Sequence, residues 1–281
     1  MPTSRLYIRA SRNTLAFAVA DHTADHQVAY EPYIVRSGIS LAANLRDAFR
    51  RSQLLNRGYM RAELIIDTPV LLIPLQEFSE DTTATLYHHT YAQHNATAPH
   101  TTTPVATQVL TEVLPNLNAV AAYAVNSDLR LVVEDHFTDV RFSHVMSPVW
   151  AHMLNRNFNG PHRKLYAYMH DKQTDVFSFD KNRFRFSNTF EATSVSDTVY
   201  HLLHVWKTLA LDTQTDELYI AHATQQPDQA ASRQERQALT DTLRRYLAKV
   251  YSVNPSADFN RAPVTLIKGM PLDLVIRFVK G

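Results

Sequence analysis

Histidine is the residue type in this chain that most invites a chemical role. There are 14 histidines in 281 residues, and several lie close together. The groups are His22 with His26; His88, His89, His94 and His100; and His201 with His204. Zinc needs three or four ligands held by a second layer of contacts, and no His-Glu-x-x-His spacing occurs. We therefore expect no metal site.

Other catalytic motifs are missing as well. The pairs Asp21-His22 and Asp135-His136 are not matched by a Gly-x-Ser-x-Gly nucleophile motif. The chain has no cysteine, which excludes disulfides, thiolate metal sites and cysteine nucleophiles. Its few glycines are Gly38, Gly58, Gly160, Gly269 and Gly281. Because no two are neighbours, there is neither a Walker loop nor a dinucleotide-binding fingerprint.

Composition indicates a folded protein without a polyanionic partner. The apolar content of 45% and charged content of 20% are ordinary for a globular chain. A formal net charge of +1 gives no global field for nucleic acid, so none is expected. No apolar stretch approaches the roughly 20 residues that span a bilayer. Residues 1–10 contain no signal-peptide run, and we expect a cytoplasmic protein.

The elements that would position functional residues begin with short β-prone runs and a helix. The β-prone runs are residues 5–10, 14–20 and 28–35 and, after the helix, 63–67. The helix is predicted by a serine cap followed by apolar residues on one face. These residues are Ser40, Leu41, Leu45, Ala48 and Phe49. The first unit is therefore βββαβ.

The same order of elements returns after Gly160. Lys164-Leu165-Tyr166 matches Arg5-Leu6-Tyr7, and Glu217-Leu218-Tyr219-Ile220 matches Glu63-Leu64-Ile65-Ile66. The apolar face of the helix repeats as Val195, Val199, Leu202 and Leu203. Agreement in order predicts a duplicated unit. The alternative is two unrelated α/β domains that share an element order.

We expect two domains, residues 1–158 and 159–281. Ser147-Pro148 begins a helix and Asn159-Gly160-Pro161 ends it, so the boundary follows that helix. The first domain carries an insertion around residues 70–125.

Two further features belong to the second domain. Ser232 and Glu235 have the spacing of a capping box, which predicts a helix from there to Lys249. The tail, residues 264–280, is apolar and is expected to dock on the domain.

A doubled β-β-β-α-β-α-β unit resembles the duplicated ribonuclease-H-like fold of the actin-like ATPase superfamily. The resemblance covers nearly the whole chain by topology. In length and strand pattern the chain also resembles an uncharacterised "domain of unknown function" family of Bacteroidetes proteins with that fold. The resemblance implies an α/β protein of duplicated ribonuclease-H-like βββαβαβα units, an actin-like ATPase fold with a degenerate nucleotide site.

The resemblance also implies where phosphates would bind. In actin-like ATPases they lie between two β-hairpins, each with an Asp and a Gly close to a Ser or Thr. The first hairpin here, residues 9–13, has neither Asp nor Gly. The second keeps Asp171 and Thr174 and has Lys172, which could meet a phosphate, but it lacks glycine. The alternative for these three residues is a polar turn that stabilises the hairpin.

Ribonuclease-H-type nucleases hold two metal ions about 4 Å apart between acids on the first strand, first helix and fourth strand. The first half offers Asp47 and Asp67 but no acid on its first strand. The second half offers Asp171 and Asp197, but its fourth strand ends in His222. Neither half completes the set.

The function most consistent with this sequence is a non-catalytic scaffold or assembly partner without a cofactor, because the duplicated core lacks the glycines and acids that its chemistry requires. The alternative is a nucleotide-binding protein that holds ATP with magnesium at Lys172 and Thr174 between the halves, with residues 11–13 closing over the phosphates. A protein partner is expected. The sequence also allows a homodimer paired through an edge strand of the insertion.

Overall fold

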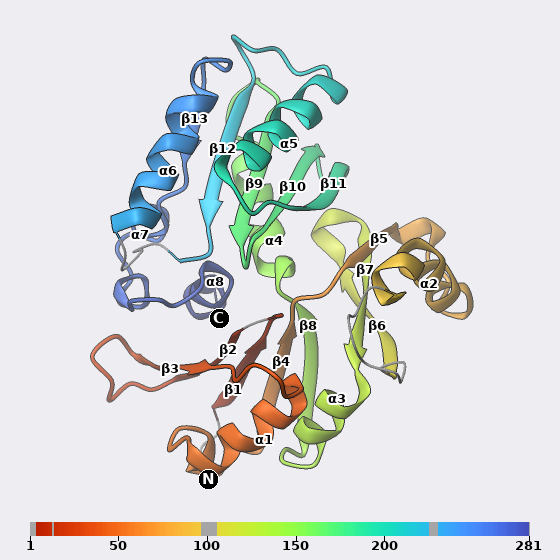
Figure 1. Ribbon diagram of the computed structural model, residues 1–281, viewed down its shortest axis with the longest axis vertical. Coiled ribbons are helices and arrows are strands. Elements are labelled where there is room, and N and C mark those ends of the chain that lie inside the picture. The colour runs from red at the N-terminus through yellow and green to blue at the C-terminus, as the bar shows by residue number, and fades with distance from the viewer. Residues whose placement is uncertain (1–3, 13, 97–105, 225–229, 281) are drawn as a thin grey trace. The chain divides into compact units, whose positions relative to one another are not determined.

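The computed structural model describes residues 4–12, 14–96, 106–224 and 230–280. The chain divides into two units, Met1–Ser147 and Pro148–Gly281. The division falls at the start of the helix expected over residues 148–158, whereas the sequence predicts a boundary at the end of that helix. Each unit has its own five-stranded sheet, and Figure 1 shows helices packed along both.

The sheet of the N-terminal unit has the order β3-β2-β1-β4-β8. Its strands are β1 (Arg5–Ala10), β2 (Thr14–Ala20), β3 (Val28–Ile34), β4 (Arg61–Ile66) and β8 (Asp139–His144). The first three form an antiparallel meander, and β4 and β8 run parallel to β1. Helices α1 (Leu41–Arg51) and α3 (Ser127–Glu134) bury their apolar faces in one core with this sheet. Ser40 caps α1 as expected, with its side chain accepting from the amide of Ala43.

The insertion forms a small sheet of its own, in the order β5-β7-β6. Its elements are β5 (Val70–Pro74), α2 (Glu80–Ala96), β6 (Thr107–Leu114) and β7 (Ala119–Asn126). The strands are antiparallel, and α2 packs on them through Tyr87, which lies against Ile73 and Ala122. The hydroxyl of Tyr87 donates to the carbonyl of Pro69 at 2.7 Å, which fixes the helix to the start of β5.

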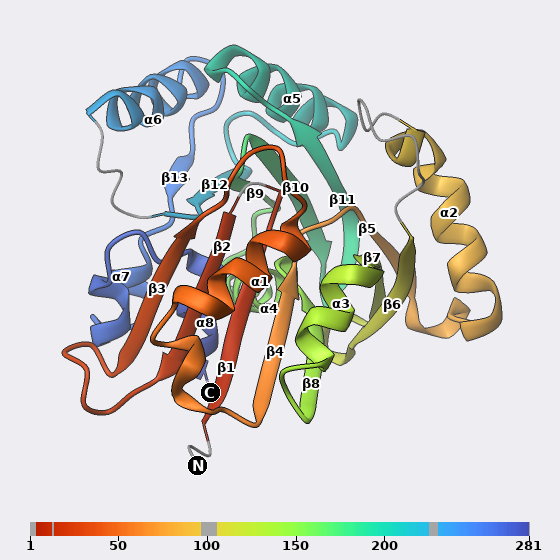
Figure 2. The same cartoon turned by 60° about the horizontal axis from the view of Figure 1, so that its bottom comes forward.

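The C-terminal unit repeats the first sheet strand for strand, in the order β11-β10-β9-β12-β13. Its strands are β9 (Lys164–His170), β10 (Gln173–Asp180), β11 (Arg183–Glu191), β12 (Glu217–His222) and β13 (Val250–Ser252). Helices α5 (Val195–Thr208) and α6 (Ala230–Leu243) lie side by side on one face (Figures 1 and 2). The expected duplication is confirmed.

The opposite face of this sheet carries the remaining helices. They are α4 (Met146–Asn157), α7 (Pro255–Asp258) and α8 (Leu272–Lys280). Trp150 of α4 packs edge-on against Phe184 of β11, and Asp273 of α8 accepts a hydrogen bond from Tyr168 of β9. The tail is buried as expected, from Leu272 to Ile276.

Two details differ from the sequence prediction. Helix α6 already begins at Ala230 and ends at Leu243, so Ser232 lies inside it and the predicted capping box and extension to Lys249 are wrong. Glu63 pairs with Tyr7 whereas Glu217 pairs with Lys164, so the two glutamates are not equivalent in the two units. A shift of two residues preserves the inward and outward pattern of a strand, which is why the apolar pattern did not reveal it.

No helix among the described residues is long and apolar enough to cross a membrane.

Candidate functional site

The second predicted phosphate hairpin forms the turn between β9 and β10. Asp171 and Lys172 are its two central residues, with φ angles of 42° and 62°. Two consecutive residues with positive φ are typical of a type I′ turn, which favours asparagine, aspartate and glycine. The turn therefore forms here without glycine. Lys172 is exposed, and its carbonyl accepts a hydrogen bond from the amide of Ala192 at 3.0 Å.

Thr174 points away from this turn, into the core under the helices. It pairs with Met169 on β9 and with Phe190 on β11, and it lies two residues before the core residue Val176. Alternate residues of a strand share a face, so Thr174 faces α5 with Val176. Its side chain is 0% exposed, and its hydroxyl has no hydrogen-bond partner among the described residues.

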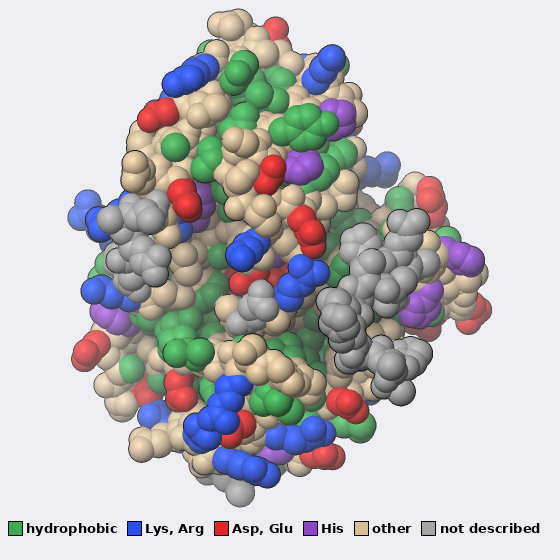
Figure 3. Space-filling model, viewed as in Figure 1, with side chains coloured by type: hydrophobic (Ala, Val, Ile, Leu, Met, Phe, Trp, Pro, Cys, Tyr) green, Lys and Arg blue, Asp and Glu red, His purple; other side chains and the backbone are tan. Residues whose placement is uncertain are grey.

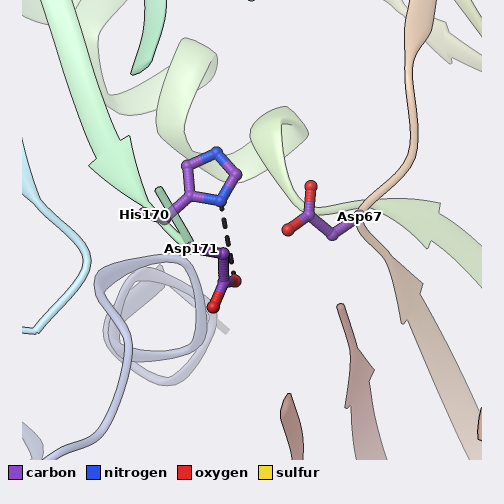
Figure 4. Close-up of side chains that lie close together, drawn as sticks. All are labelled: Asp67, His170 and Asp171. Carbon is purple, nitrogen blue, oxygen red and sulfur yellow. Dashed lines mark ion pairs between the residues drawn. The ribbon is translucent and has the colours of Figure 1, made fainter. Parts of the chain in front are cut away.

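The other face of the hairpin carries a buried polar network. Nε2 of His170 lies 2.5 Å from Oδ2 of Asp175, and the hydroxyl of Thr189 donates to Oδ1 of Asp175 at 2.5 Å. Nδ1 of His170 is 3.8 Å from Oδ2 of Asp171, the ion pair drawn in Figure 4. The ring of His170 also stacks on Tyr168, with 5.0 Å between centroids. Both oxygens of Asp175 are therefore engaged within the hairpin and its neighbouring strand.

The three candidate phosphate-binding residues are thus divided between two environments. Asp171 and Lys172 are adjacent at the turn, but the hydroxyl of Thr174 lies on the helix-covered face. Sequence reasoning missed the pair His170 and Asp175. The signal was present, because residues that flank a two-residue hairpin turn at these positions face the same side of the sheet.

The remaining predicted acids have structural contacts. Asp47 of α1 accepts from the hydroxyl of Tyr33 at 2.8 Å and pairs with Arg51 at 3.1 Å. The hydrogen bond from Tyr33 is the main reason why the pKa of Asp47 lies below its usual value. Asp197 closes a capping box with Ser194 at the start of α5, and this cap lowers its pKa. Among the residues that the structure describes, neither acid belongs to a group of three or more potential metal ligands.

The first hairpin and the histidine groups can be described in part. Ser11 and Thr14 bond to each other across the first turn, hydroxyl to hydroxyl at 2.6 Å, whereas Asn13 lies outside the described residues. His201 stacks on Phe190 with 4.7 Å between centroids, and His204 is exposed. The side chains of residues 94 and 100 also lie outside the described part of the chain.

Comparison with known families gives one match over most of the chain. The model of the family described as "Protein of unknown function (DUF3822)" matches residues 2–250. The chain belongs to this family. The resemblance stated from the sequence is thereby confirmed. No curated protein matches the chain.

A solved structure shows which fold the chain has. A protein from Bacteroides thetaiotaomicron, described as having an actin-like ATPase fold and unknown function, superimposes with a TM-score of 0.73 at 22% identity. The match covers 92% of this chain and 95% of that one. The chain therefore has the actin-like ATPase fold.

Two more distant structures have lower scores. The ethanolamine utilization protein EutJ from Carboxydothermus hydrogenoformans has a TM-score of 0.45 at 9% identity, over 98% of this chain and 90% of that one. The PilM-PilN type IV pilus biogenesis complex has a TM-score of 0.47 at 8% identity, over 90% and 89%.

Replacing Thr174 by valine is expected to stabilise this family member by about 1 kcal/mol, because a buried hydroxyl without a partner costs free energy that a methyl group does not. Both tryptophans, Trp150 and Trp206, lie in the C-terminal unit, so tryptophan fluorescence during urea unfolding reports on that unit. The matched control is Thr198→Val. Thr198 is equally buried, but its hydroxyl donates to the carbonyl of Ser194, and its loss should cost about 1 kcal/mol. A Thr174 variant destabilised like the Thr198 variant would contradict this assignment.

His222, at the end of β12, makes the C-terminal unit sensitive to acid. Burial, with a smaller contribution from the charge of Arg236, lowers the pKa of His222 to about 3. The native state therefore binds fewer protons than the unfolded state below the unfolded pKa of about 6.5. Stability is full above that pH and is lost as the pH falls from there towards 3.

The corresponding variant is His222→Gln. Between pH 6.5 and 5 the wild type should lose about 1–2 kcal/mol that the variant does not lose. Urea midpoints measured at several pH values give this difference. Parallel pH curves for the two proteins would show that His222 is not the group responsible.

Proposed function

We propose that this chain is a non-catalytic module with an actin-like ATPase fold, which acts as a scaffold or assembly partner and does not hydrolyse a nucleotide. The observation that supports the proposal most is the arrangement of the polar side chains in the second hairpin. Its threonine hydroxyl faces the helix-covered core, and both oxygens of its buried aspartate accept hydrogen bonds from neighbouring side chains.

The chemistry of phosphate binding explains why this matters. A phosphate between hairpins is held by backbone amides and hydroxyls that point at it, and glycine lets the backbone come close. In this hairpin the turn positions are taken by Asp171 and Lys172, each of which carries a side chain where glycine would leave the backbone open. The hydroxyl of Thr174 would have to leave an apolar core to reach a ligand there. The polar groups of the hairpin stabilise the fold and are not arranged for phosphoryl transfer.

Phosphate release from ATP with Mg²⁺ tests this proposal. We expect no turnover above the protein-free blank. The variants are Asp171→Ala at the turn and, as a control, Asp180→Ala, an exposed aspartate at the far end of the same strand. Turnover that Asp171→Ala abolishes and Asp180→Ala preserves would overturn the proposal.

The second candidate function is nucleotide binding without hydrolysis. It is favoured by one observation: Lys172 is exposed at the hairpin turn and forms no ion pair with a described residue. A lysine in that position can act as a point charge for a phosphate. The variant Lys172→Ala separates the two candidate functions. If the hairpin binds a nucleotide, this substitution should weaken the binding of ATP, whereas a scaffold without a nucleotide site has no such binding to lose.

Strand β6 of the insertion offers an edge at which a protein partner can bind. Among the described residues β6 pairs with β7 alone, so its other edge has no strand partner. Edge strands are usually protected by charges or proline. The only charged residue of β6 is Glu112, whose carboxylate accepts from the amide of His144 and the hydroxyl of Ser147. We propose that a second copy of the chain pairs here.

Light scattering after size-exclusion chromatography tests this pairing. Val113 of β6 is 53% exposed, and Val113→Lys places a charge on the edge strand without disturbing a core. We expect a dimer for the wild type and a monomer for the variant. A monomeric wild type, or a dimer that survives the substitution, would exclude pairing through β6.

A further inference from the structure

The C-terminal unit contains a cavity that the residues of the hairpin do not line. It lies at the carboxyl ends of β12 and β13, between α6 and residues 252–268, and has a volume of about 840 Å³. Ligands of α/β proteins commonly bind outside the carboxyl ends of parallel strands. The volume is in the range of small-molecule sites, roughly 300–1,000 Å³.

The lining of this cavity is positively charged. Arg233 and Arg236 project from α6 three residues apart, and Lys268 comes from the segment that follows β13, whereas the described lining residues include no aspartate or glutamate. None of these three cations forms an ion pair with a residue that the structure describes. Lys and Arg side chains gather on the left of the face in Figure 3, beside the lower end of α6 in Figure 1.

Arg236 is the cation that the fold holds most firmly. Its guanidinium donates to the carbonyl of Thr224 at 2.7 Å, which keeps it at the end of β12. It is partly buried, and this burial lowers its pKa. The same positive charge helps to lower the pKa of His222. Burial of a guanidinium group costs free energy, and an anion bound beside Arg236 would offset that cost, because no carboxylate is among the described residues that line the cavity.

Neutral polar side chains also line the cavity. Ser252 ends β13 and Asn254 follows it, and both lie on the cavity with Ser256. Thr265 lines it as well, but its hydroxyl already donates to the carbonyl of Ala262 and can only accept there. The side-chain oxygen of Asn254 is used as a cap for the amides of Ser256 and Ala257, so its amide nitrogen is the group left to donate. Arginine forks, a lysine and small polar donors around one space are the groups that bind phosphate oxygens.

We propose that this cavity binds a small phosphate-bearing molecule, held by Arg233, Arg236 and Lys268. The site is separate from the hairpin and does not depend on the proposed scaffold function. Three cations around one space favour a multiply charged phosphate over a single carboxylate, whereas the paired hydrogen bonds of a guanidinium group suit both kinds of anion.

The probe is inorganic pyrophosphate, titrated into the full chain by isothermal calorimetry at constant ionic strength. The test variant is Arg233→Gln with Lys268→Gln, because both side chains are exposed and their loss should not disturb folding. The matched control is Arg245→Gln, an exposed arginine of the same unit that does not line the cavity. We expect the double variant to weaken binding by about tenfold or more and the control to leave it unchanged.

Several outcomes would overturn the proposal. They are no binding of pyrophosphate at millimolar concentration, equal binding by the wild type and the double variant, or equal loss in the control. Citrate, a carboxylate of comparable charge, tests which class of ligand the cavity prefers. If citrate binds as tightly as pyrophosphate, the assignment to phosphate is refuted. Circular dichroism of each variant confirms that it is folded.

Discussion

Replacing Asp175 by alanine is expected to lower the free energy of unfolding of the C-terminal unit by about 3 kcal/mol. The carboxylate is buried, with 6% of the residue exposed, and it holds both His170 and Thr189. Its removal leaves the imidazole of His170 without the oxygen that lies 2.5 Å from Nε2. A buried polar group that loses its partner costs more than the lost hydrogen bond was worth. Urea unfolding followed by tryptophan fluorescence measures the change.

The control for this substitution is Asp180→Ala on the same strand. Asp180 is exposed, and its replacement should change the stability by less than about 0.5 kcal/mol. A double-mutant cycle of Asp175→Ala with His170→Ala isolates the pair, and we expect a coupling energy above about 1 kcal/mol. Additive effects, or equal losses at positions 175 and 180, would mean that the network does not support the hairpin.

Replacing Lys164 by methionine should destabilise the same unit by about 2 kcal/mol. Lys164 opens β9 and is 1% exposed, and burial lowers its pKa. Its ammonium donates to the carbonyls of Arg156, Asn157 and Asn159 at the end of α4, at 3.1 Å to the first of these. The last carbonyls of a helix have no partner within the helix, and a positive charge there also favours the helix dipole.

Methionine keeps most of the length and apolar surface of this side chain, so the effect measures the ammonium group. The control is Lys207→Met in the last turn of α5, where the lysine is exposed and little change is expected. An unchanged or raised urea midpoint for Lys164→Met would show that desolvation of the buried charge outweighs its bonds to the three carbonyls.

The duplicated core could be predicted because its signals are local. Strand alternation, a serine cap and polar turns recur in one order in both halves, and the two sheets share one strand order. The register between them could not be predicted. A two-residue slip leaves every apolar residue facing inward, so the sequence pattern matches Glu63 with Glu217. The two glutamates pair with Tyr7 and Lys164, at different positions along the first strand of each unit.

Thr174 shows how a motif can mislead when strand geometry is left out. Proximity in the sequence groups Thr174 with Asp171 and Lys172. Alternation along β10 places it with Val176, a core residue, whereas Asp175 shares the opposite face with His170. Side chains alternate between the two faces of a strand, so the face of each residue after a two-residue turn can be predicted from its position. This part of the site could therefore be predicted from the sequence.

The cavity could not be found from the sequence. Arg233 and Arg236 are three residues apart on a helix, which is common for solvated arginines. Lys268 comes from a segment whose position depends on how the chain returns after β13. Short strands such as β13, with three residues, have too little pattern to be predicted, and the elements that follow them are placed by tertiary packing.

Thermal unfolding with and without millimolar ATP and Mg²⁺ tests the central claim, that the hairpin is not a nucleotide site. A ligand that binds the native state alone must raise the midpoint. ATP also carries phosphates that the cavity of the C-terminal unit can bind, so Lys172→Ala and the Arg233→Gln, Lys268→Gln double variant are measured beside the wild type. We expect any rise of the midpoint in the wild type to persist in Lys172→Ala and to disappear in the double variant. A rise of several degrees that Lys172→Ala removes and the double variant retains would contradict it.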